Sequence, residues 1–366
     1  MSSFLASAFY ENDFDIDVAR QERYPIWIGR LIVQRREEKE RDIWNQVFTD
    51  RGCEQYKPRR YILKAFPQLE QSLLSGQSIH IVDLGCGAGA TLLPILRMID
   101  MTKTVNRQRR IEISGYDLSN VALESLSIQC DHLLEANCLL KESLGIRLAE
   151  WDLTKRFEES AIELKLHGFM ANRIRYSSST TNIMNDFNLK KECESEENSA
   201  VTICLDMEGL PTKQLASVNE ESNQIKSNQD LEGHEVQKQI TPEADFGLMV
   251  FTLSAIDPVE QVQALRNASM QLKLGGLLMI RDYGSWDLIQ VRTKKRVGEW
   301  TVEKEDGVLC TFYTIESLTS LVEHAGMELV EPPRYCTVKN TNRKEGKVML
   351  RVFIRCVARR RLPPDE

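Results

Sequence analysis

Hydrophobic residues along the chain alternate between short apolar runs and longer amphipathic stretches. The short runs are rich in β-branched residues, are typical of buried strands, and lie at residues 79–83, 111–117, 146–151, 245–254 and 277–282. The amphipathic stretches between them are typical of helices and lie at residues 91–101, 120–138 and 258–272. This alternation predicts an α/β fold, with a mostly parallel sheet and helices on both faces.

Further elements are expected at the two ends of this core. Residues 1–18 are expected to be disordered, residues 18–48 follow a charged helical pattern, and residues 61–74 predict a helix ahead of the first strand. Two apolar stretches near the C-terminus, 327–334 and 348–358, predict an antiparallel hairpin that closes a seven-stranded sheet.

The periodic pattern fails between the third and fourth strands, and residues 170–242 are expected to form an acidic, disordered insertion. Residues 186–245 contain 14 Asp and Glu against 5 Lys, within a chain of net charge −7, so the remainder carries +2. The last 33 residues hold 10 Lys and Arg against 3 Asp and Glu. This mildly basic body with a basic tail permits a nucleic-acid partner.

Composition excludes several other classes of protein. No apolar run approaches the roughly 18 residues that span a bilayer, and the acidic first 17 residues argue against secretory or mitochondrial targeting. The nine cysteines are scattered without a C-x-x-C pair, so neither a metal site nor a disulfide framework is expected. We therefore expect no membrane and no metal, and a cytoplasmic location with the nucleus as the alternative.

The first apolar run ends in a glycine-rich turn. Asp83 is followed by Gly85, Gly87 and Gly89 at alternate positions, and then by a helical pattern. Glycines permit positive φ and close approach of a ligand, and the following helix N-terminus presents free N–H groups. The sequence therefore predicts a nucleotide-type ligand at the carboxyl end of this strand. Asp117, at the end of the second strand, is placed to accept hydrogen bonds from ribose hydroxyls.

The D-x-G-x-G-x-G order of this turn resembles the first motif of S-adenosylmethionine-dependent methyltransferases. The resemblance implies a Rossmann-like class I methyltransferase fold with a seven-stranded, mostly parallel sheet and helices on both faces. The composition adds to this fold the long disordered insertion expected at 170–242. In such enzymes a carboxylate after the third strand often binds the adenine amino group, a role for which Glu150 and Asp152 compete.

Other phrases resemble the tRNA N3-methylcytidine methyltransferase family. They are the segment from Trp44 to Phe48, residues 56–61 with Phe66, residues 250–258, Arg281-Asp282-Tyr283-Gly284, and residues 342–346 with Arg351-Val352-Phe353. The resemblance implies S-adenosyl-L-methionine as cofactor and 3-methylcytidine formation in the tRNA anticodon loop, at position 32 of the tRNA. It also favours Asp152 over Glu150, and implies that the cofactor contacts include Trp44, Phe48, Gly85, Asp117, Asp152, Leu153 and Val250. Residues 300–308 depart from the family pattern by losing an arginine and a threonine.

The sequence pattern and the resemblance together predict three parts. They are a helical N-terminal extension over residues 1–75 that contributes to the cofactor and tRNA site, a methyltransferase domain over 76–358 interrupted by 170–242, and a basic tail over 359–366.

Cytosine N3 has a neutral lone pair, so the reaction needs orientation more than a strong base. The 3-methylcytidine product is cationic, which suggests Asp282 as a nearby carboxylate, Tyr283 as a stacking wall and Arg281 as an RNA-facing residue. Seven basic residues are candidate phosphate contacts: Lys57, Arg59, Arg60, Arg292, Lys294, Lys344 and Arg351.

The sequence also permits alternatives to a tRNA enzyme. One is a methyltransferase of another RNA or of a small molecule, and another is a non-catalytic methyltransferase-fold partner subunit. Methylation of an exocyclic amine would need an N/D-P-P-Y/F motif, and methylation of cytosine carbon would need a cysteine, after the fourth strand; residues 254–258 supply neither. Expected partners are tRNA and, as an open alternative, an activating protein subunit or a tRNA synthetase.

Overall fold

The structure is a computed structural model, and all of its described residues belong to one compact unit. The described residues are 15–33, 39–53, 57–102, 109–136, 138–157, 164–168, 244–342 and 347–362. The expected insertion at 170–242 therefore lies outside the described residues, as do nearly all of residues 1–18.

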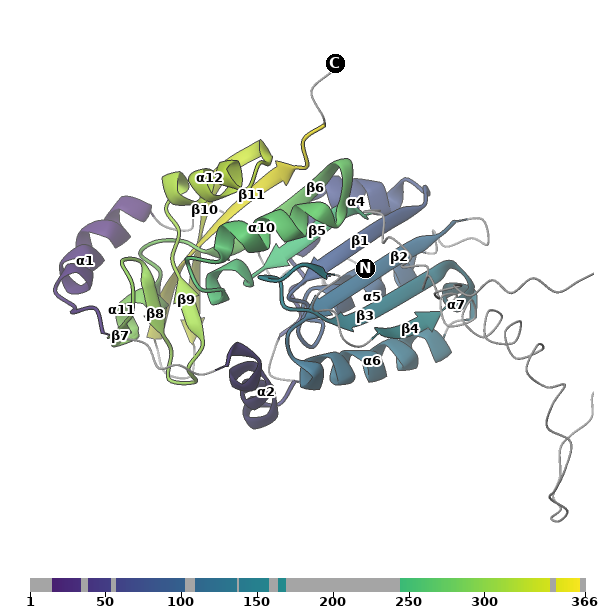
Figure 1. Ribbon diagram of the computed structural model, residues 1–366, viewed down its shortest axis with the longest axis horizontal. Coiled ribbons are helices and arrows are strands. Elements are labelled where there is room, and N and C mark those ends of the chain that lie inside the picture. The colour runs from purple at the N-terminus through teal and green to yellow at the C-terminus, as the bar shows by residue number, and fades with distance from the viewer. Residues whose placement is uncertain are drawn as a thin grey trace, which may run out of the picture. The chain divides into compact units, whose positions relative to one another are not determined.

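An eight-stranded sheet forms the centre of the described part (Figure 1). Its strands are β1 (Ile79–Leu84), β2 (Ile111–Asp117), β3 (Leu144–Glu150), β4 (Leu164–Gly168), β5 (Ala244–Val250), β6 (Leu272–Tyr283), β10 (Glu328–Asn342) and β11 (Lys347–Arg359). Their order is β10-β11-β6-β5-β1-β2-β3-β4. The pairs among β1, β2, β3, β5 and β6 are parallel, whereas β3–β4, β6–β11 and β10–β11 are antiparallel. The predicted fold class and the closing hairpin are confirmed.

The sheet has one strand more than the seven predicted, because β4 adds an antiparallel edge strand to β3. β4 has only five residues and lies where the sequence shows no sustained period, so its pattern was too short to recognise. Its His167 is fixed to the neighbouring helix, with Nδ1 2.6 Å from an Asp131 oxygen and Nε2 3.2 Å from the Ser127 hydroxyl.

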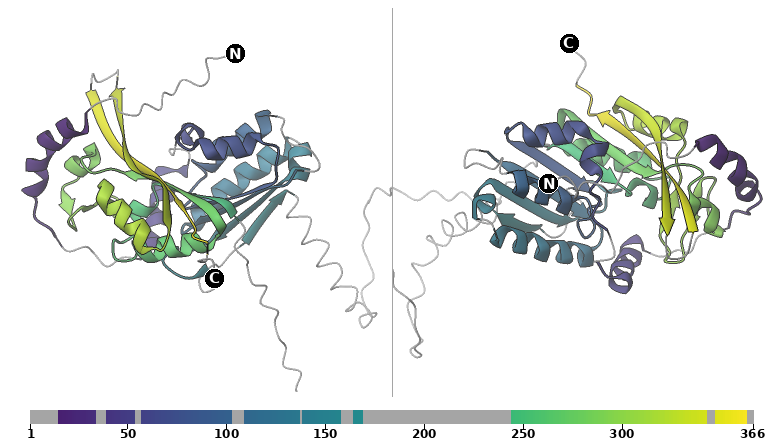
Figure 2. Two further views of the ribbon diagram at one scale, coloured as in Figure 1. Left: turned by 90° about the horizontal axis from the view of Figure 1, so that it is seen from above. Right: turned by 180° about the vertical axis from the view of Figure 1, so that it is seen from behind.

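Helices cover both faces of the sheet (Figures 1 and 2). One face packs against α3 (Ile62–Ala65), α4 (Pro67–Leu74), α5 (Leu92–Thr102), α6 (Asn120–Glu135) and α7 (Cys138–Ser143); the other packs against α10 (Gln261–Met270) and α12 (Ile315–His324). In β1, Ile81 belongs to the first apolar cluster and Val82 to the second, so the strand is buried on both faces as a parallel strand requires.

The N-terminal helices are shorter than the pattern predicted. The helical stretch expected over 18–48 contains two helices, α1 (Ile16–Ile28) and α2 (Glu40–Arg51). The helix expected over 61–74 is divided into α3 and α4, because Pro67 disfavours a helical conformation at the residue before it. Phe66 accordingly has φ −132° and ψ 79°.

A second, three-stranded sheet was not predicted. It consists of β7 (Lys295–Arg296), β8 (Thr301–Glu303) and β9 (Leu309–Thr311), and it follows the short helix α11 (Leu288–Arg292). Its strands have two or three residues each, too few for a period-two pattern to emerge. Helix α1 packs beside it, where the Arg296 guanidinium lies 4.5 Å from the Trp27 ring centroid.

The C-terminal hairpin extends beyond the sheet that it closes. β11 pairs with β6 only from Phe353 to Arg359, so the remaining part of β10–β11 forms a two-stranded ribbon (Figure 2). The described residues of the basic C-terminal segment, 359–362, contact the sheet through two arginines. Arg359 forms an ion pair with Glu328 at 3.6 Å, and Nη1 of Arg360 donates to the Leu272 carbonyl at 2.6 Å.

Candidate active site

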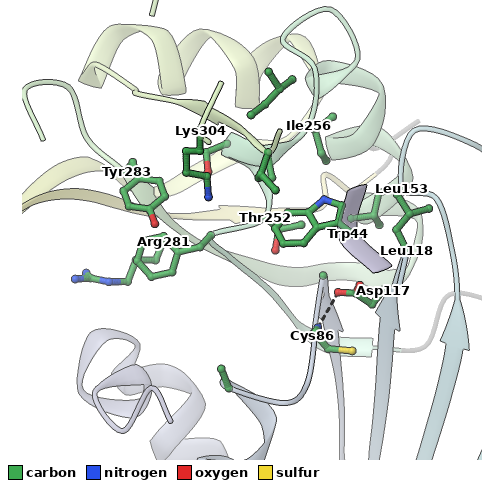
Figure 3. A pocket seen from close by; sticks show the side chains of 18 of the residues that line it. Trp44, Cys86, Asp117, Leu118, Leu153, Thr252, Ile256, Arg281, Tyr283 and Lys304 are labelled. Atoms are coloured by element: carbon green, nitrogen blue, oxygen red, sulfur yellow. Dashed lines mark hydrogen bonds between the residues drawn. The ribbon is translucent and has the colours of Figure 1, made fainter. Parts of the chain in front are cut away.

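A cavity of about 800 Å³ lies at the carboxyl ends of β1, β2, β5 and β6. The glycine turn after β1 forms part of its lining, and so do α2, the loop after β3, the 3-10 turn η2 (Leu253–Ala255) and the β8–β9 hairpin. Because strand ends from several elements converge here, residues far apart in the sequence line one space. Figure 3 shows Asp117, Leu118 and Leu153 on one side of this space, and Arg281, Tyr283 and Lys304 on the other.

Gly85 allows the turns after β1 and β5 to approach each other. Its φ is +77°, and a Cβ built on it would lie 2.4 Å from two Thr252 side-chain atoms. The Thr252 hydroxyl donates to the Leu84 carbonyl at 2.9 Å. Any side chain at Gly85 would therefore separate the two turns that form the cavity floor.

Gly87 and Asp117 form the next part of the lining. The Gly87 N–H donates to Oδ2 of Asp117 at 2.7 Å (Figure 3). The Ser119 N–H donates to Oδ1 at 2.9 Å. Burial raises the pKa of Asp117 to about 6, although these hydrogen bonds favour its ionised form. Trp44 and Phe48 face this region from α2, and a Cβ on Gly87 would lie 3.1 Å from Phe48.

Gly89 is placed differently from the other two glycines of the turn. It does not line the cavity, and a Cβ on it would lie 2.5 Å from Leu126 and 3.0 Å from Leu93. Its φ of +87° and this close packing serve the contact between the turn and the helices behind it.

Asp152 and Leu153 line the cavity after β3. Oδ1 of Asp152 accepts hydrogen bonds from the Thr154 N–H and hydroxyl, which orient the carboxylate. Glu150, the competing candidate, does not line the cavity and forms an ion pair with Arg41 at 2.6 Å. The structure thus places Asp152 at the cavity.

Asp83 lies beneath the glycine turn and does not line the cavity. It is 1% exposed, and its Oδ2 has no hydrogen-bond partner among the described residues. Burial raises its pKa to about 7; the Asp117 charge adds to this rise and Arg59 opposes it.

An aromatic and cationic compartment forms the other side of the cavity. The Arg281 guanidinium lies 4.8 Å from the Tyr61 ring centroid and 5.0 Å from that of Phe353. The rings of Phe251 and Tyr283 lie 4.9 Å apart beside it. Guanidinium and aromatic groups stack on planar bases, so this compartment suits a nucleobase.

Two predicted site residues, Asp282 of β6 and Val250 of β5, do not line the cavity. Asp282 is fully buried, and its carboxylate accepts the N–H groups of Ser254 at 3.0 Å and Tyr283 at 2.8 Å. Burial raises its pKa to about 6. Val250 packs in the core, and its carbonyl accepts a 2.9 Å hydrogen bond from Arg59. Strand alternation turns both side chains away from the cavity and brings their neighbours into it.

The basic candidates are divided between the cavity and the surface. Lys57, Arg59 and Arg351 line the cavity. Arg351 is held by Asp287, whose carboxylate oxygens lie 2.9 and 3.2 Å from its Nε. The remaining candidates are Arg60, Arg292 and Lys294, which are exposed and outside the lining, and Lys344, which lies outside the described residues.

Several lining residues were not expected from the sequence. Phe251 and Thr252 directly follow Val250, and the φ of +59° at Phe251 turns the chain there. Lys304 and Val308 come from the β8–β9 hairpin, whose strands are too short to recognise. The end of a predicted strand is thus a signal for the first two residues. For the second two the only signal is the family resemblance of residues 300–308, which does not indicate individual side chains.

The sheet order and the cavity together define the class of protein. A parallel sheet closed by an antiparallel hairpin, with a glycine turn after its first strand, is the architecture of a class I methyltransferase. A family model described as "Methyltransferase domain" matches residues 52–331. The match covers more than half of the chain, so the chain belongs to this family of methyltransferase domains.

Curated tRNA methyltransferases are among the relatives that the chain resembles. It is 36% identical over 123 residues to the tRNA N(3)-methylcytidine methyltransferase of Drosophila melanogaster, covering 32% of this chain and 37% of that protein. It is 37% identical over 117 residues to a tRNA N(3)-cytidine methyltransferase of Homo sapiens, covering 31% and 30%. The chain therefore spans about a third of the length of these relatives.

A solved structure of a SAM-dependent methyltransferase from Methanosarcina mazei aligns with 14% identity and a TM-score of 0.44, covering 81% of this chain and 99% of that one.

The cavity fits S-adenosylmethionine, the cofactor of class I methyltransferases. Asp117 and Asp152 offer only acceptors, which match the hydroxyl and amino donors of an adenosine. Because Gly87 has no side chain, the space between its backbone and the Phe48 ring stays open; a Cβ at this position would lie 3.1 Å from that ring. Within the described ranges, no three His, Cys, Asp or Glu side chains converge to hold a metal ion, and no helix is long and apolar enough to cross a membrane.

Proposed function

We propose that the protein transfers the methyl group of S-adenosylmethionine to N3 of a cytidine in tRNA. The observation that carries this proposal is a single cavity with two chemically different sides. Carboxylates line the side of Asp117 and Asp152, and stacked aromatic and guanidinium groups line the side of Tyr283 and Arg281. The relatives named as tRNA N3-cytidine methyltransferases support this choice of substrate over other bases.

The residues on the side of Asp117 and Asp152 bind and orient the cofactor. The Asp117 carboxylate, held by the N–H groups of Gly87 and Ser119, accepts the ribose hydroxyls, and Asp152 accepts the adenine amino group. Trp44 and Phe48 cover the adenosine from α2. The bound cofactor supplies an electrophilic methyl group on a sulfonium.

The residues of the second side hold the base. A cytosine that leaves the loop stack enters between the aromatic side chains, with Tyr283 as one wall. Its N3 lone pair needs no deprotonation, so the protein contributes mainly orientation and exclusion of water. Because Asp282 does not line the cavity, its role in this mechanism is to hold the Ser254 turn and the Tyr283 backbone.

The finer identity of the substrate follows the family resemblance. We propose the anticodon loop, at position 32 of the tRNA, as the target, with Lys57 and Arg59 at the cavity as phosphate contacts. A synthetase or an activating subunit remains a proposed partner, and the cytoplasm, or alternatively the nucleus, the proposed location.

The test is methyl transfer from labelled S-adenosylmethionine to total tRNA, followed by digestion to nucleosides. We expect labelled 3-methylcytidine, lost in Asp117→Ala together with cofactor binding. Arg281→Met, which keeps an apolar chain against Tyr61 but removes the charge, should lose at least tenfold in transfer and keep cofactor affinity. Arg266→Met, at an exposed position on α10 outside the cavity lining, is the control for the loss of one positive charge. Transfer to a different nucleoside, or cofactor binding without any transfer to tRNA, would contradict the proposal.

A further inference from the structure

Helix α2 forms a wall of the cavity and contacts two separate parts of the fold. On one side Phe48 packs against Ala88 of the glycine turn and Ala122 of α6. On the other side Ile43 packs with Val308 of the β8–β9 hairpin. In Figure 1, α2 accordingly lies between α6 and the small sheet. The helix thus joins the cofactor side of the cavity to the substrate side.

The position of α2 depends on these contacts more than on the helix itself. It has 12 residues, and its N-cap residue, Lys39, makes no side-chain capping hydrogen bond. An isolated helix of this length is marginal in water, so tertiary contacts decide whether it forms and where it lies.

An ion pair lies near each end of α2. Near the N-terminal end, Nη2 of Arg41 lies 2.6 Å from Oε1 of Glu150, at the end of β3. At the C-terminal end, Nη2 of Arg51 lies 2.5 Å from Oδ2 of Asp306, in the turn between β8 and β9. In both pairs the carboxylate side chain is nearly buried, 10% and 12% exposed, whereas the arginine is 42% and 47% exposed.

This asymmetry suits contacts that open and close. A nearly buried carboxylate favours its cation strongly, and a half-exposed arginine can leave for water without being stranded in the interior. Between the two pairs, the Ser119 hydroxyl donates to Oδ1 of Asn45 at 2.8 Å, which adds a neutral polar contact from the N-cap of α6 to the middle of the helix.

We propose that Arg41–Glu150 and Arg51–Asp306 are positioning pairs that hold α2 closed over the bound cofactor and set how long the cofactor stays bound. Trp44 and Phe48 lie on the segment between the pairs, so cofactor release requires α2 to move away from the glycine turn. This inference rests on the proposed function only for the identity of the cofactor.

The experiment measures dissociation of S-adenosylhomocysteine from the full chain by stopped flow. We expect Arg41→Glu and Arg51→Glu each to raise the dissociation rate roughly fivefold, the upper range for partly exposed ion pairs. Arg51→Lys, which keeps the charge, should stay within about twofold of the unsubstituted protein. Exchanging the partners, with Arg51→Asp and Asp306→Arg together, should restore part of the slow rate. Lys273→Glu breaks the Lys273–Asp245 ion pair at the amino ends of β5 and β6, whose cation is exposed to a similar degree but whose carboxylate is 32% exposed, and should leave the rate unchanged.

Salt supplies a second readout that does not depend on any variant folding. Ion pairs weaken as ionic strength rises, so the dissociation rate of the unsubstituted protein should increase several-fold between about 0.05 and 0.5 M salt. The variant carrying both Arg41→Glu and Arg51→Glu should show a weaker or reversed salt dependence.

The outcomes separate this inference from the proposed function. If S-adenosylhomocysteine binds but its dissociation is indifferent to salt and to both arginine substitutions, the positioning role is overturned and the proposed function is untouched. If the unsubstituted protein binds no S-adenosylhomocysteine, both are overturned. If the methylated nucleoside formed is not 3-methylcytidine, while release of S-adenosylhomocysteine still depends on salt, the proposed function alone is overturned.

Discussion

The Gly87 N–H donates a 2.7 Å hydrogen bond to Oδ2 of Asp117, and this bond joins the turn after β1 to the end of β2. Because the turn's own backbone orients the carboxylate at the cavity, we expect Asp117 to act as a fixed acceptor for the cofactor. We expect Asp117→Ala to weaken S-adenosylhomocysteine binding roughly 100-fold, since hydrogen bonds to a charged group contribute about 1.5–3 kcal/mol each. Isothermal titration calorimetry measures this loss.

The same carboxylate predicts a pH dependence of cofactor binding. The pKa of Asp117 is raised to about 6, and the ionised form is the better acceptor, so affinity should fall as pH drops below 6. At pH 5 only about a tenth of the carboxyl groups are ionised, which predicts a roughly tenfold weaker affinity than at pH 7. Asp117→Asn should bind weakly with a flat profile. A flat profile in the unsubstituted protein would contradict this assignment.

Asp83 should limit the stability of the protein at neutral pH. Its pKa is about 7 in the folded state against about 3.9 when unfolded, so the folded state holds a proton that the unfolded state releases. The free energy of unfolding contributed by this group therefore decreases as pH rises from about 4 to 7, and stays low above pH 7. We expect Asp83→Asn to be more stable than the unsubstituted protein at pH 8, by about 2–4 kcal/mol.

Urea unfolding at pH 5 and pH 8 checks this expectation. The gain from Asp83→Asn should be clearly larger at pH 8 than at pH 5. An equal gain at both values would mean that the effect comes from packing and not from the charge.

The two glycines on either side of Ala88 should respond differently to alanine. Gly89→Ala places a Cβ 2.5 Å from Leu126 at φ +87°, so we expect a loss of about 2–4 kcal/mol in stability. Gly87→Ala also places an alanine at positive φ, +51°, but its Cβ would meet only the edge of the Phe48 ring, at 3.1 Å, and an Asp117 oxygen at 4.0 Å. We therefore expect a smaller loss of stability than for Gly89→Ala and a clear loss of cofactor affinity. Thermal unfolding and calorimetric binding of S-adenosylhomocysteine, measured on both variants, distinguish the two losses. The prediction is wrong if Gly87→Ala is the less stable variant.

The sequence predicted those parts of the fold that repeat a strong local pattern. Strands 79–83 and 111–117 have boundaries close to β1 and β2, because their β-branched and apolar residues form a compact group bounded by polar turn residues. β4 and the small sheet were missed, because strands of two to five residues are specified by their partners and not by their own period.

The candidate site was predictable to the level of strand ends but not of side-chain direction. Asp117 and Asp152 follow β2 and β3 and line the cavity, as a residue after a parallel strand often does. Asp282 was predicted at the site because it lies at the end of β6, yet its side chain points away from the cavity and accepts from the Ser254 N–H. Successive side chains of a strand point to opposite faces of the sheet, so an error of one residue places the side chain on the wrong face. The counter-charge of Arg351 is Asp287, 64 residues away, and a contact at that separation leaves no trace in one sequence.

Asp287 should be among the most sensitive positions of the substrate side. It is fully buried, caps α11 through the Ile289 N–H, and accepts from Arg351 at 2.9 Å and from the Val352 N–H at 2.7 Å. Removing one partner of a buried ion pair leaves the other charge uncompensated, so Asp287→Ala should cost about 3–5 kcal/mol of stability. Arg351→Met should cost a comparable amount.

A double-mutant cycle tests whether the two residues act as one unit. If they do, combining Asp287→Asn with Arg351→Met should cost clearly less than the sum of the single substitutions, by at least about 1 kcal/mol in urea unfolding. Arg359→Met on the same strand is the matched control, because its partner Glu328 is exposed and its loss should cost less than about 1 kcal/mol. The Arg351 guanidinium also lies 5.7 Å from the Tyr283 ring centroid, so methyl transfer should fall in the combined variant even if its loss of stability is smaller than the sum.

Strictly additive losses of stability would contradict this prediction. They would show that Arg351 acts independently of Asp287, and would favour the role of phosphate contact that the sequence suggested for Arg351.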